Sequence, residues 1–252
     1  MKLSEVFTDA DVARAYRQRA PYPEETFAIL EELVVGPRAV LDAGAGTGGL
    51  ARRMLRFADR VDAVDPSAAM IDEGRRLPGG DDPRLRWING TAEEAPLDPP
   101  YGLITTGQSL HWMDAARVMP RFAAALAPGA RLAILEPDDG DYQLREEMWD
   151  VIARYSELDH HSEFPEMVAE LEASGRFVRE GERRTAPARL SRTVDEHLEF
   201  LHSTSTLARV RLGGRAGHFD AEVRDLFAQR GISIIERQVV GVVVWGRPGG
   251  AA

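Results

Sequence analysis

A glycine-rich turn and two acidic residues are the side chains of this sequence best suited to chemistry. Residues 40–48 read VLDAGAGTG, and Asp65 ends a second apolar run roughly 20 residues after the glycines. Glycine lets a backbone turn sharply and approach a ligand closely, and the first N–H groups of the following helix can donate to that ligand. An acid placed like Asp65 can accept hydrogen bonds from both hydroxyls of a ribose. The spacing therefore predicts a site for a cofactor that contains a nucleoside.

The acid before the glycines bears on which cofactor binds. Gly44, Gly46 and Gly49 formally meet the glycine spacing of dinucleotide-binding enzymes, so the glycines alone do not show which cofactor binds. Asp42 stands just before them, where a carboxylate would repel a pyrophosphate but could hold the cationic amino group of a methionine moiety. This favours a sulfonium amino-acid cofactor. For Asp65, the alternative is that it caps the next helix.

Strand-like and helix-like segments alternate along the chain and must position these residues. Strands are expected over 39–43, 60–65, 85–88, 103–106, 131–136, 177–190 and 232–245. Helices are expected over 9–20, 24–34, 50–57, 68–76, 114–126, 143–158, 165–174, 193–201 and 219–230. This alternation predicts an α/β fold, with a doubly wound, mostly parallel, seven-stranded sheet between helices.

The whole chain, 1–252, is predicted to form one domain with three parts. Residues 1–35 would be an N-terminal helical lid, interrupted where prolines at 21 and 23 disfavour helix. Residues 36–137 would be the cofactor-binding core, and residues 138–252 would supply a cover for the substrate and the final strands.

Composition limits the function classes. The net charge of −10, from 31 basic and 41 acidic residues, repels a phosphate backbone. Without cysteine there are no disulfides, thiolate metal sites or cysteine nucleophiles. No apolar stretch is long enough to span a bilayer, and the first residues lack the apolar run of a signal peptide. We expect a cytoplasmic monomer or homodimer that binds a small molecule and contacts neither nucleic acid nor membrane.

Four motifs in register resemble the class I S-adenosylmethionine-dependent methyltransferases of the small-molecule type, the methyltransferase type 11 group. They are VLDAGAGTG, VDAVDPSAAMI, NGTAEEAPL and the QSLHW of residues 108–112. The resemblance covers about residues 10–137. It implies a Rossmann-like sheet, S-adenosylmethionine as cofactor with S-adenosylhomocysteine as product, and methyl transfer to a small-molecule acceptor.

The resemblance also implies roles for single residues. Asp42, Gly44 and Gly46 would lie against the methionine portion, and Asp65 would bind the ribose. Ala69 or Met70 would pack near the adenine. The family often places an acid after the third strand to contact the adenine amino group. Here Thr91 stands at that point, so the Ala92 N–H would contact the adenine ring instead. The Glu93 side chain is the alternative contact. The predicted cofactor-binding residues are Asp42, Gly44, Ala45, Gly46, Asp65, Pro66, Met70, Thr91, Ala92, Glu93, Gln108 and Tyr16.

Two of these come from other segments. Gln108 follows the fourth strand, and ligands bind at the carboxyl ends of strands in an open parallel sheet, so we expect it to contact the methionine end of the cofactor. Tyr16 lies in the predicted lid, from which an aromatic residue closes over the cofactor in similar proteins. An aromatic ring beside a sulfonium gains cation–π attraction. The alternative for Tyr16 is packing within an amphipathic helix.

Methyl transfer mainly requires alignment and exclusion of water. A general base is needed only when the acceptor must lose a proton. His111 is the predicted base, with the adjacent His160 and His161 as second choice. The predicted substrate-contacting residues are Tyr22, His111, Trp112, His160 and His161. The alternative is that His111 and Trp112 form a structural corner, and for Trp112 the core is favoured. No metal site is expected, since adjacent histidines in a helix point in different directions.

Three other functions stay open at this point. A protein of this fold can bind S-adenosylmethionine and catalyse cyclisation or another rearrangement, or it can be a non-catalytic cofactor-binding module. A nicotinamide-dependent oxidoreductase also fits the glycine spacing. Asp42 argues against it, and so does the lack of a Tyr-x-x-x-Lys pair in a chain whose one lysine is Lys2.

Overall fold

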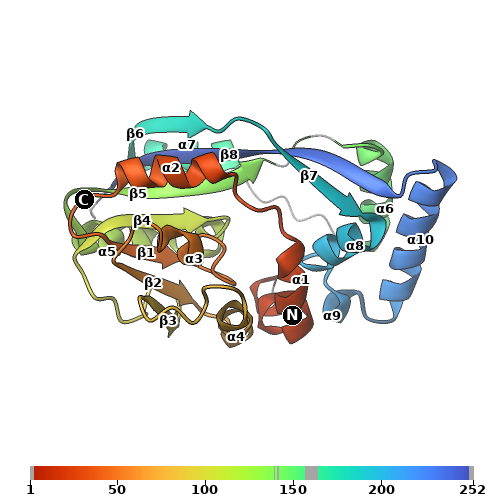
Figure 1. Ribbon diagram of the computed structural model, residues 1–252, viewed down its shortest axis with the longest axis horizontal. Coiled ribbons are helices and arrows are strands. Elements are labelled where there is room, and N and C mark those ends of the chain that lie inside the picture. The colour runs from red at the N-terminus through yellow and green to blue at the C-terminus, as the bar shows by residue number, and fades with distance from the viewer. Residues whose placement is uncertain (1–2, 139, 141, 157–163, 250–252) are drawn as a thin grey trace. The chain divides into compact units, whose positions relative to one another are not determined.

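The computed structural model describes residues 3–138, 140, 142–156 and 164–249. The chain forms two compact units, which we call the helical unit and the sheet unit (Figure 1). The helical unit contains Met1–Pro21, Asp139–His160 and Pro187–Val239. The sheet unit contains Tyr22–Asp138, His161–Ala186 and Val240–Ala252. Each unit is described separately below.

The sheet unit is built on a mostly parallel sheet. Its strands are β1 (Ala39–Ala43), β2 (Arg60–Asp65), β3 (Leu85–Asn89), β4 (Tyr101–Gly107), β5 (Leu126–Asp138), β6 (Phe177–Arg184) and the second half of β8 (Ile234–Pro248). They lie in the order β3-β2-β1-β4-β5-β8-β6. Neighbours from β3 to β5 are parallel, and β8 is antiparallel to β5 and β6. The carboxyl ends of β1 to β5 therefore share one edge of the sheet.

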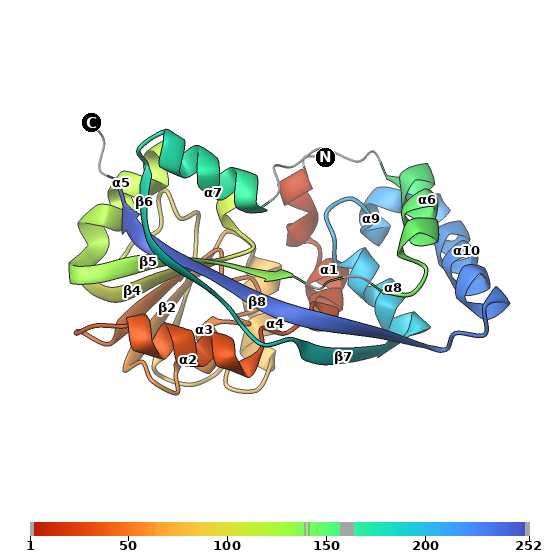
Figure 2. The same cartoon turned by 90° about the horizontal axis from the view of Figure 1, so that it is seen from above.

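Helices cover both faces of this sheet. Successive strand residues point to opposite sides, and because β1 and β4 are buried along nearly their whole length, both faces need a cover. They are α2 (Glu24–Leu33), α3 (Ala51–Met54), α4 (Ala68–Arg76), η3 (Leu110–Trp112), α5 (Ala115–Ala125) and α7 (Phe164–Ala173). On one face, α2 and α3 bury Leu30 and Met54 against Val40. On the other, α5 buries Phe122 against Leu41. Figure 2 shows α2 and α3 on one side of the sheet and α5 and α7 on the other.

The helical unit has a core of its own. Its elements are η1 (Leu3–Thr8), α1 (Ala10–Ala15), η2 (Tyr16–Gln18), α6 (Arg145–Tyr155), β7 (Ala188–Thr193), the first half of β8, α8 (Val194–His202), α9 (Arg209–Leu212), η4 (Gly213–Arg215) and α10 (Ala216–Gln229). Met148, Leu198, Phe219 and Phe227 are buried together between α6, α8 and α10. In the part of the chain that the structure describes, no helix is long and apolar enough to cross a membrane.

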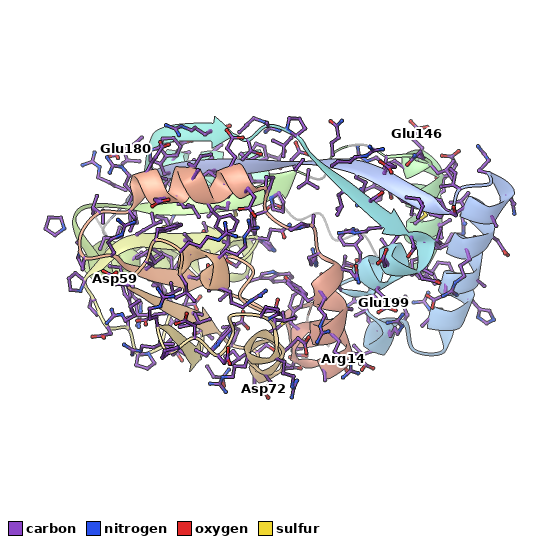
Figure 3. The ribbon with its side chains drawn as sticks, in the orientation of Figure 1. Arg14, Asp59, Asp72, Glu146, Glu180 and Glu199 are labelled. Carbon is purple, nitrogen blue, oxygen red and sulfur yellow. The ribbon has the colours of Figure 1, made fainter. Side chains whose placement is uncertain are left out.

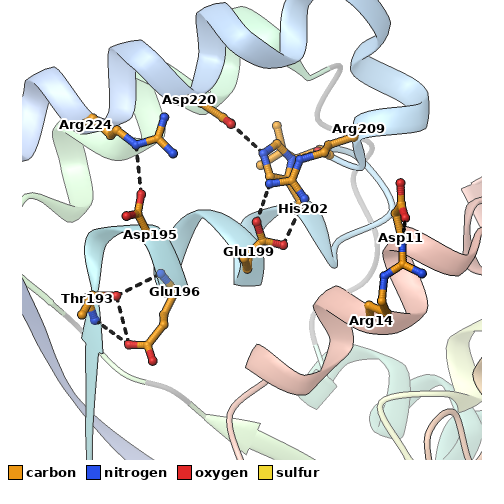
Figure 4. A network of polar contacts seen from close by, with 11 residues as sticks. Asp11, Arg14, Thr193, Asp195, Glu196, Glu199, His202, Arg209, Asp220 and Arg224 are labelled. Carbon is orange, nitrogen blue, oxygen red and sulfur yellow. Dashed lines mark hydrogen bonds and ion pairs between the residues drawn. The ribbon is translucent and has the colours of Figure 1, made fainter. Parts of the chain in front are cut away.

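One face of α8 carries paired charges (Figure 4). The buried His202 imidazole lies 2.7 Å from an Asp220 carboxylate oxygen and 2.8 Å from the Leu207 carbonyl oxygen. Arg209 donates to Glu199, and Arg224 donates to Asp195 at 3.0 Å. These contacts attach α8 to α9 and α10 within the helical unit.

The predicted fold class is confirmed, and the predicted strands and helices of the first half of the chain recur with small shifts at their ends. The expected strand 177–190 is wrong as one strand. It ends at Arg184, and a new strand starts at Ala188, because Pro187 lacks the N–H that a sheet ladder needs. Among the described residues the sheet consequently has eight strands, with β7 as the extra one, paired to β8. The short helix α9 was not expected.

Candidate active site

The glycine turn joins three strands at the carboxyl edge of the sheet unit. Gly44, Gly46 and Gly48 have φ values of 71°, 55° and 76°, in the left-handed region that favours glycine. The N–H groups of Gly44 and Ala45 both donate to the Val64 carbonyl of β2, at 2.8 and 2.9 Å. A Cβ on Gly44 would lie 2.4 Å from the Cβ of Ser109, which follows β4. The backbone path of this turn therefore depends on glycine.

Asp65 at the end of β2 holds this turn in place. One carboxylate oxygen accepts from the Gly46 N–H at 2.8 Å, and the other accepts from the Ser67 N–H at 2.8 Å. The N-cap of α4 is Ser67, whose hydroxyl oxygen accepts from the Met70 N–H. Burial raises the pKa of Asp65, and the two N–H donors oppose that rise. Each oxygen of an ionised carboxylate keeps a further lone pair for a ligand.

Asp42 at the end of β1 is almost fully buried. Its side chain is 1% exposed and accepts from the Thr105 hydroxyl at 2.9 Å and from the Ala51 N–H at 3.2 Å. Burial raises the pKa of Asp42 to about 7, and the two donors reduce that rise. A cation placed beside this carboxyl group would favour its ionised form. The Asp42 side chain is thus held in place by two hydrogen bonds, and its ionisation state can respond to a bound cation.

The segment after β3 contains the residues that were predicted to contact the adenine. Thr91 is exposed, Ala92 is buried, and the Thr91 carbonyl accepts from the Ala95 N–H at 2.8 Å. The Glu93 carboxylate accepts from the Asp114 N–H at 2.8 Å, just before α5. On α4, Met70 is buried, whereas Pro66 is exposed.

A pair of polar side chains lies at the ends of β4 and β5. Gln108 has φ of 51°, a conformation that few residues other than glycine adopt, and its N–H donates to the Leu135 carbonyl. Its side-chain amide donates to a Glu136 carboxylate oxygen at 2.9 Å. Sequence reasoning missed Glu136. The signal that could have found it is an acid at the last position of an expected strand, the same signal that singled out Asp65.

Comparison with known proteins agrees with this geometry. Residues 40–130 match the model of a family described as a methyltransferase domain. An uncharacterized methyltransferase of Mycobacterium tuberculosis is 40% identical over 120 residues, which are 47% of this chain and 47% of that protein. Over residues 40–130, the chain is therefore similar to a methyltransferase domain.

Two further relatives show how far the likeness to this methyltransferase domain extends. The trans-aconitate 2-methyltransferase of Variovorax paradoxus is 37% identical over 105 residues, 40% of this chain and 39% of that protein. The chain therefore spans less than half the length of the curated relatives it matches. A structure described as a type II methyltransferase from Anaeromyxobacter dehalogenans covers 92% of this chain and 99% of its own, with a TM-score of 0.64 and 24% identity. That likeness shows the fold.

The residues predicted to face the acceptor lie in several places. A Cβ on Gly107 would lie 2.5 Å from the Tyr22 hydroxyl, which places Tyr22 at the carboxyl end of β4 in the sheet unit. His111 is exposed and Trp112 is half-buried in η3, with ring centroids 4.8 Å apart. His160 and His161 lie outside the described residues.

Tyr16 belongs to the helical unit. It lies in η2, its ring centroid is 6.2 Å from that of Phe7, and the Arg19 guanidinium carbon lies 4.9 Å from its centroid. Its expected contact with the cofactor stays a prediction. In the described part of the chain, no group of three or more histidine, aspartate or glutamate side chains is arranged to hold a metal ion.

Proposed function

We propose that this protein binds S-adenosylmethionine at the carboxyl edge of the sheet unit and transfers its methyl group to a small-molecule acceptor. The observation that carries the proposal is the pair of buried carboxylates, Asp42 and Asp65, on either side of a turn whose glycines adopt positive φ. Acceptors of the named relatives support a small molecule, since trans-aconitate is one.

The residues present fit this cofactor. Asp65 has a lone pair left on each oxygen, which suits two ribose hydroxyls. Asp42 provides a buried carboxylate for a cationic amino group, and the turn at Gly44 brings no Cβ into the space beside it. The N–H of Ala92, Met70 and the side chain of Gln108 would complete the contacts to the adenine and the methionine end.

The chain's contribution to the reaction is binding and alignment. When bound, the cofactor supplies a methyl group activated by its positively charged sulfur. The protein then needs to hold an acceptor atom in line with that methyl group and to exclude water. For an acceptor that must lose a proton, His111 would take it, because the unprotonated nitrogen of a neutral imidazole can accept a proton. Tyr22 and Trp112 would border the acceptor.

The experiment that tests this function follows the methyl group. The full chain is incubated with methyl-labelled S-adenosylmethionine and a panel of small hydroxy, amino and carboxylic acids, and products are separated from the cofactor. Label recovered in a small molecule, together with S-adenosylhomocysteine, supports the proposal. Binding of S-adenosylhomocysteine without label in any small molecule from the panel or a metabolite extract would favour rearrangement chemistry or a non-catalytic role.

A further inference from the structure

Gln108 has a backbone conformation that its residue type does not favour. It follows β4 with φ of 51°, and among the described residues only Gln108 and Leu144 combine a side chain with a positive φ. Such a conformation is strained in residues other than glycine, and it persists where the surrounding structure fixes it, most often at functional sites. The strain therefore points to a role for Gln108 at the carboxyl edge of the sheet unit.

The neighbours of Gln108 fix it beside the glycine turn. The Ser109 hydroxyl donates to the Ala43 carbonyl of β1 at 2.7 Å. A Cβ added to Gly44 would lie 2.4 Å from the Cβ of Ser109, so the two backbones are in close contact. The Gln108 N–H donates to the Leu135 carbonyl of β5 at 3.1 Å. Gln108 is thus held next to the turn that the proposed function assigns to the methionine part of the cofactor.

Glu136 determines the orientation of the Gln108 side-chain amide. The amide nitrogen Nε2 donates to a Glu136 carboxylate oxygen at 2.9 Å. The two ends of an amide have nearly the same shape, so the hydrogen-bond partner decides which end it faces. An ionised carboxylate can only accept, and it therefore selects the nitrogen. The amide oxygen Oε1 then lies on the other side of the amide carbon.

The Oε1 atom of Gln108 is an acceptor that the sheet unit leaves open. The Gln108 side chain is half-buried, and no described residue donates to Oε1. Nor is Oε1 among the fully buried polar atoms that lack a partner, so it is accessible from outside the protein. An amide oxygen accepts hydrogen bonds from N–H and O–H groups. A ligand at this edge can therefore donate to Gln108.

Asp42 alone offers little contact to a cationic amino group. Its side chain is 1% exposed, and its two oxygens already accept from the Thr105 hydroxyl and the Ala51 N–H. A protonated amine has three N–H donors, and a donor that loses its water without gaining an acceptor is costly. The ammonium of the cofactor consequently needs a second acceptor at the same edge. In the parallel pairing of β1 with β4, Asp42 lies opposite Thr105, three residues before Gln108.

We propose that Glu136 is a positioning residue that holds the Gln108 amide so that Oε1 accepts from the ammonium group of the cofactor. The backbone places the amide beside the glycine turn, and the Glu136 carboxylate fixes which end of the amide faces the ligand. Hydrogen bonding at Nε2 also polarises the amide, which strengthens Oε1 as an acceptor. The inference rests on the proposed function, because it concerns the same cofactor, and it adds the residue that selects the amino-acid end of that cofactor.

Three adenosyl ligands test this role in binding. S-adenosylhomocysteine carries an ammonium and a carboxylate, its decarboxylated analogue carries the ammonium alone, and methylthioadenosine carries neither. In calorimetric titrations, Glu136→Gln should raise the Kd of the two ammonium ligands by about tenfold, since an amide at position 136 pairs with either end of Gln108. The Kd of methylthioadenosine should not change. A merely structural role would weaken all three ligands alike, and that result, or no change for any of them, would overturn the proposal.

Two further variants sharpen the test. The matched control is Glu32→Gln on α2, since this side chain is 59% exposed and paired with Arg183; it should leave all three Kd values unchanged. The rescue is Gln108→Glu combined with Glu136→Gln, which exchanges donor and acceptor within the pair and turns a carboxylate oxygen towards the ammonium. This double variant should bind S-adenosylhomocysteine more tightly than Glu136→Gln does. A Kd no lower than that of Glu136→Gln would contradict the proposal.

Nuclear magnetic resonance reads the positioning without any ligand. The side-chain amide resonances of Gln108 should move in Glu136→Gln and stay in place in Glu32→Gln; resonances that do not move in either variant would overturn the proposal. The titrations keep the two claims apart. If wild type binds S-adenosylhomocysteine and Glu136→Gln keeps its preference over methylthioadenosine, this inference fails and the proposed function stands. If wild type binds none of the three ligands, the proposed function fails and the inference fails with it.

Discussion

The two regions with buried ionisable side chains differ in the sign of the charge that they bury. At the carboxyl edge of the sheet unit, Asp42 and Asp65 are buried acids held by backbone N–H groups and a hydroxyl. In the helical unit, Arg192 and Arg237 are buried cations beside the aromatic rings of Phe200 and Tyr142. Burial favours the neutral form in both, raising the pKa of Asp42 to about 7 and lowering that of His197 to about 3. The first region is suited to binding hydroxyls and an ammonium.

The largest expected effect comes from removing the acid at the end of β2. Asp65→Ala should lower the affinity for S-adenosylhomocysteine by about 100-fold or more, since each hydrogen bond to a charged group contributes about 1.5–3 kcal/mol. Isothermal titration calorimetry measures this, with circular dichroism to confirm folding. Asp72→Ala on the outer side of α4 is the matched control (Figure 3), because its side chain is 56% exposed. Unchanged affinity in Asp65→Ala would remove the ribose assignment.

The glycine turn can be tested against a second glycine of the same backbone conformation. Gly44 and Gly79 have φ of 71° and 79°, but only at Gly44 would a Cβ meet another atom, the Cβ of Ser109 at 2.4 Å. Strained backbone costs about 1–3 kcal/mol, and a steric clash adds to that. We expect Gly44→Ala to lose more unfolding free energy than Gly79→Ala in urea denaturation, and to bind S-adenosylhomocysteine more weakly. Equal losses would show that the turn tolerates a side chain.

Affinity for the cofactor at the carboxyl edge of the sheet unit should depend on pH through Asp42. An ammonium binds the ionised carboxyl, so affinity for S-adenosylhomocysteine should rise as pH increases towards and through about 7. Below that pH the loss approaches about tenfold per pH unit, since one pKa unit corresponds to about 1.4 kcal/mol. Calorimetry from pH 5.5 to 8.5 measures the slope. The Asp42→Asn variant should bind weakly with little slope; a wild-type slope retained in it would assign the titration to another group.

The two regions should also contribute to stability with opposite dependence on pH. With its raised pKa, folded Asp42 binds more protons than the unfolded chain between pH 3.8 and about 7, so its contribution to stability falls as pH rises. With its lowered pKa, folded His197 binds fewer protons between about 3 and 6.5, so its contribution rises with pH. Denaturation of Asp42→Asn and His197→Gln across pH 4–6.5 should give difference curves of opposite slope. Curves of the same slope would break the comparison.

Much more of the first region than of the second could be predicted from the sequence. The turn at residues 44–48 and Asp65 follow from local rules, because glycine spacing and strand ends are visible in sequence. Glu136 was missed although it carries the same signal as Asp65. In the helical unit, residues 19, 192, 197 and 237 lie round the ring of Phe200, although no local sequence pattern connects them. The pairing of β7 with β8 brings two of them to one face of a ribbon.

The measurement that tests the central claim most directly is calorimetric titration of the wild-type chain with S-adenosylmethionine, S-adenosylhomocysteine and NAD in parallel. The account predicts saturable binding of the two adenosyl amino-acid ligands and none of NAD, with the affinity for S-adenosylhomocysteine lost in Asp65→Ala and kept in Asp72→Ala. Binding of NAD alone, or of none of the three, would contradict it.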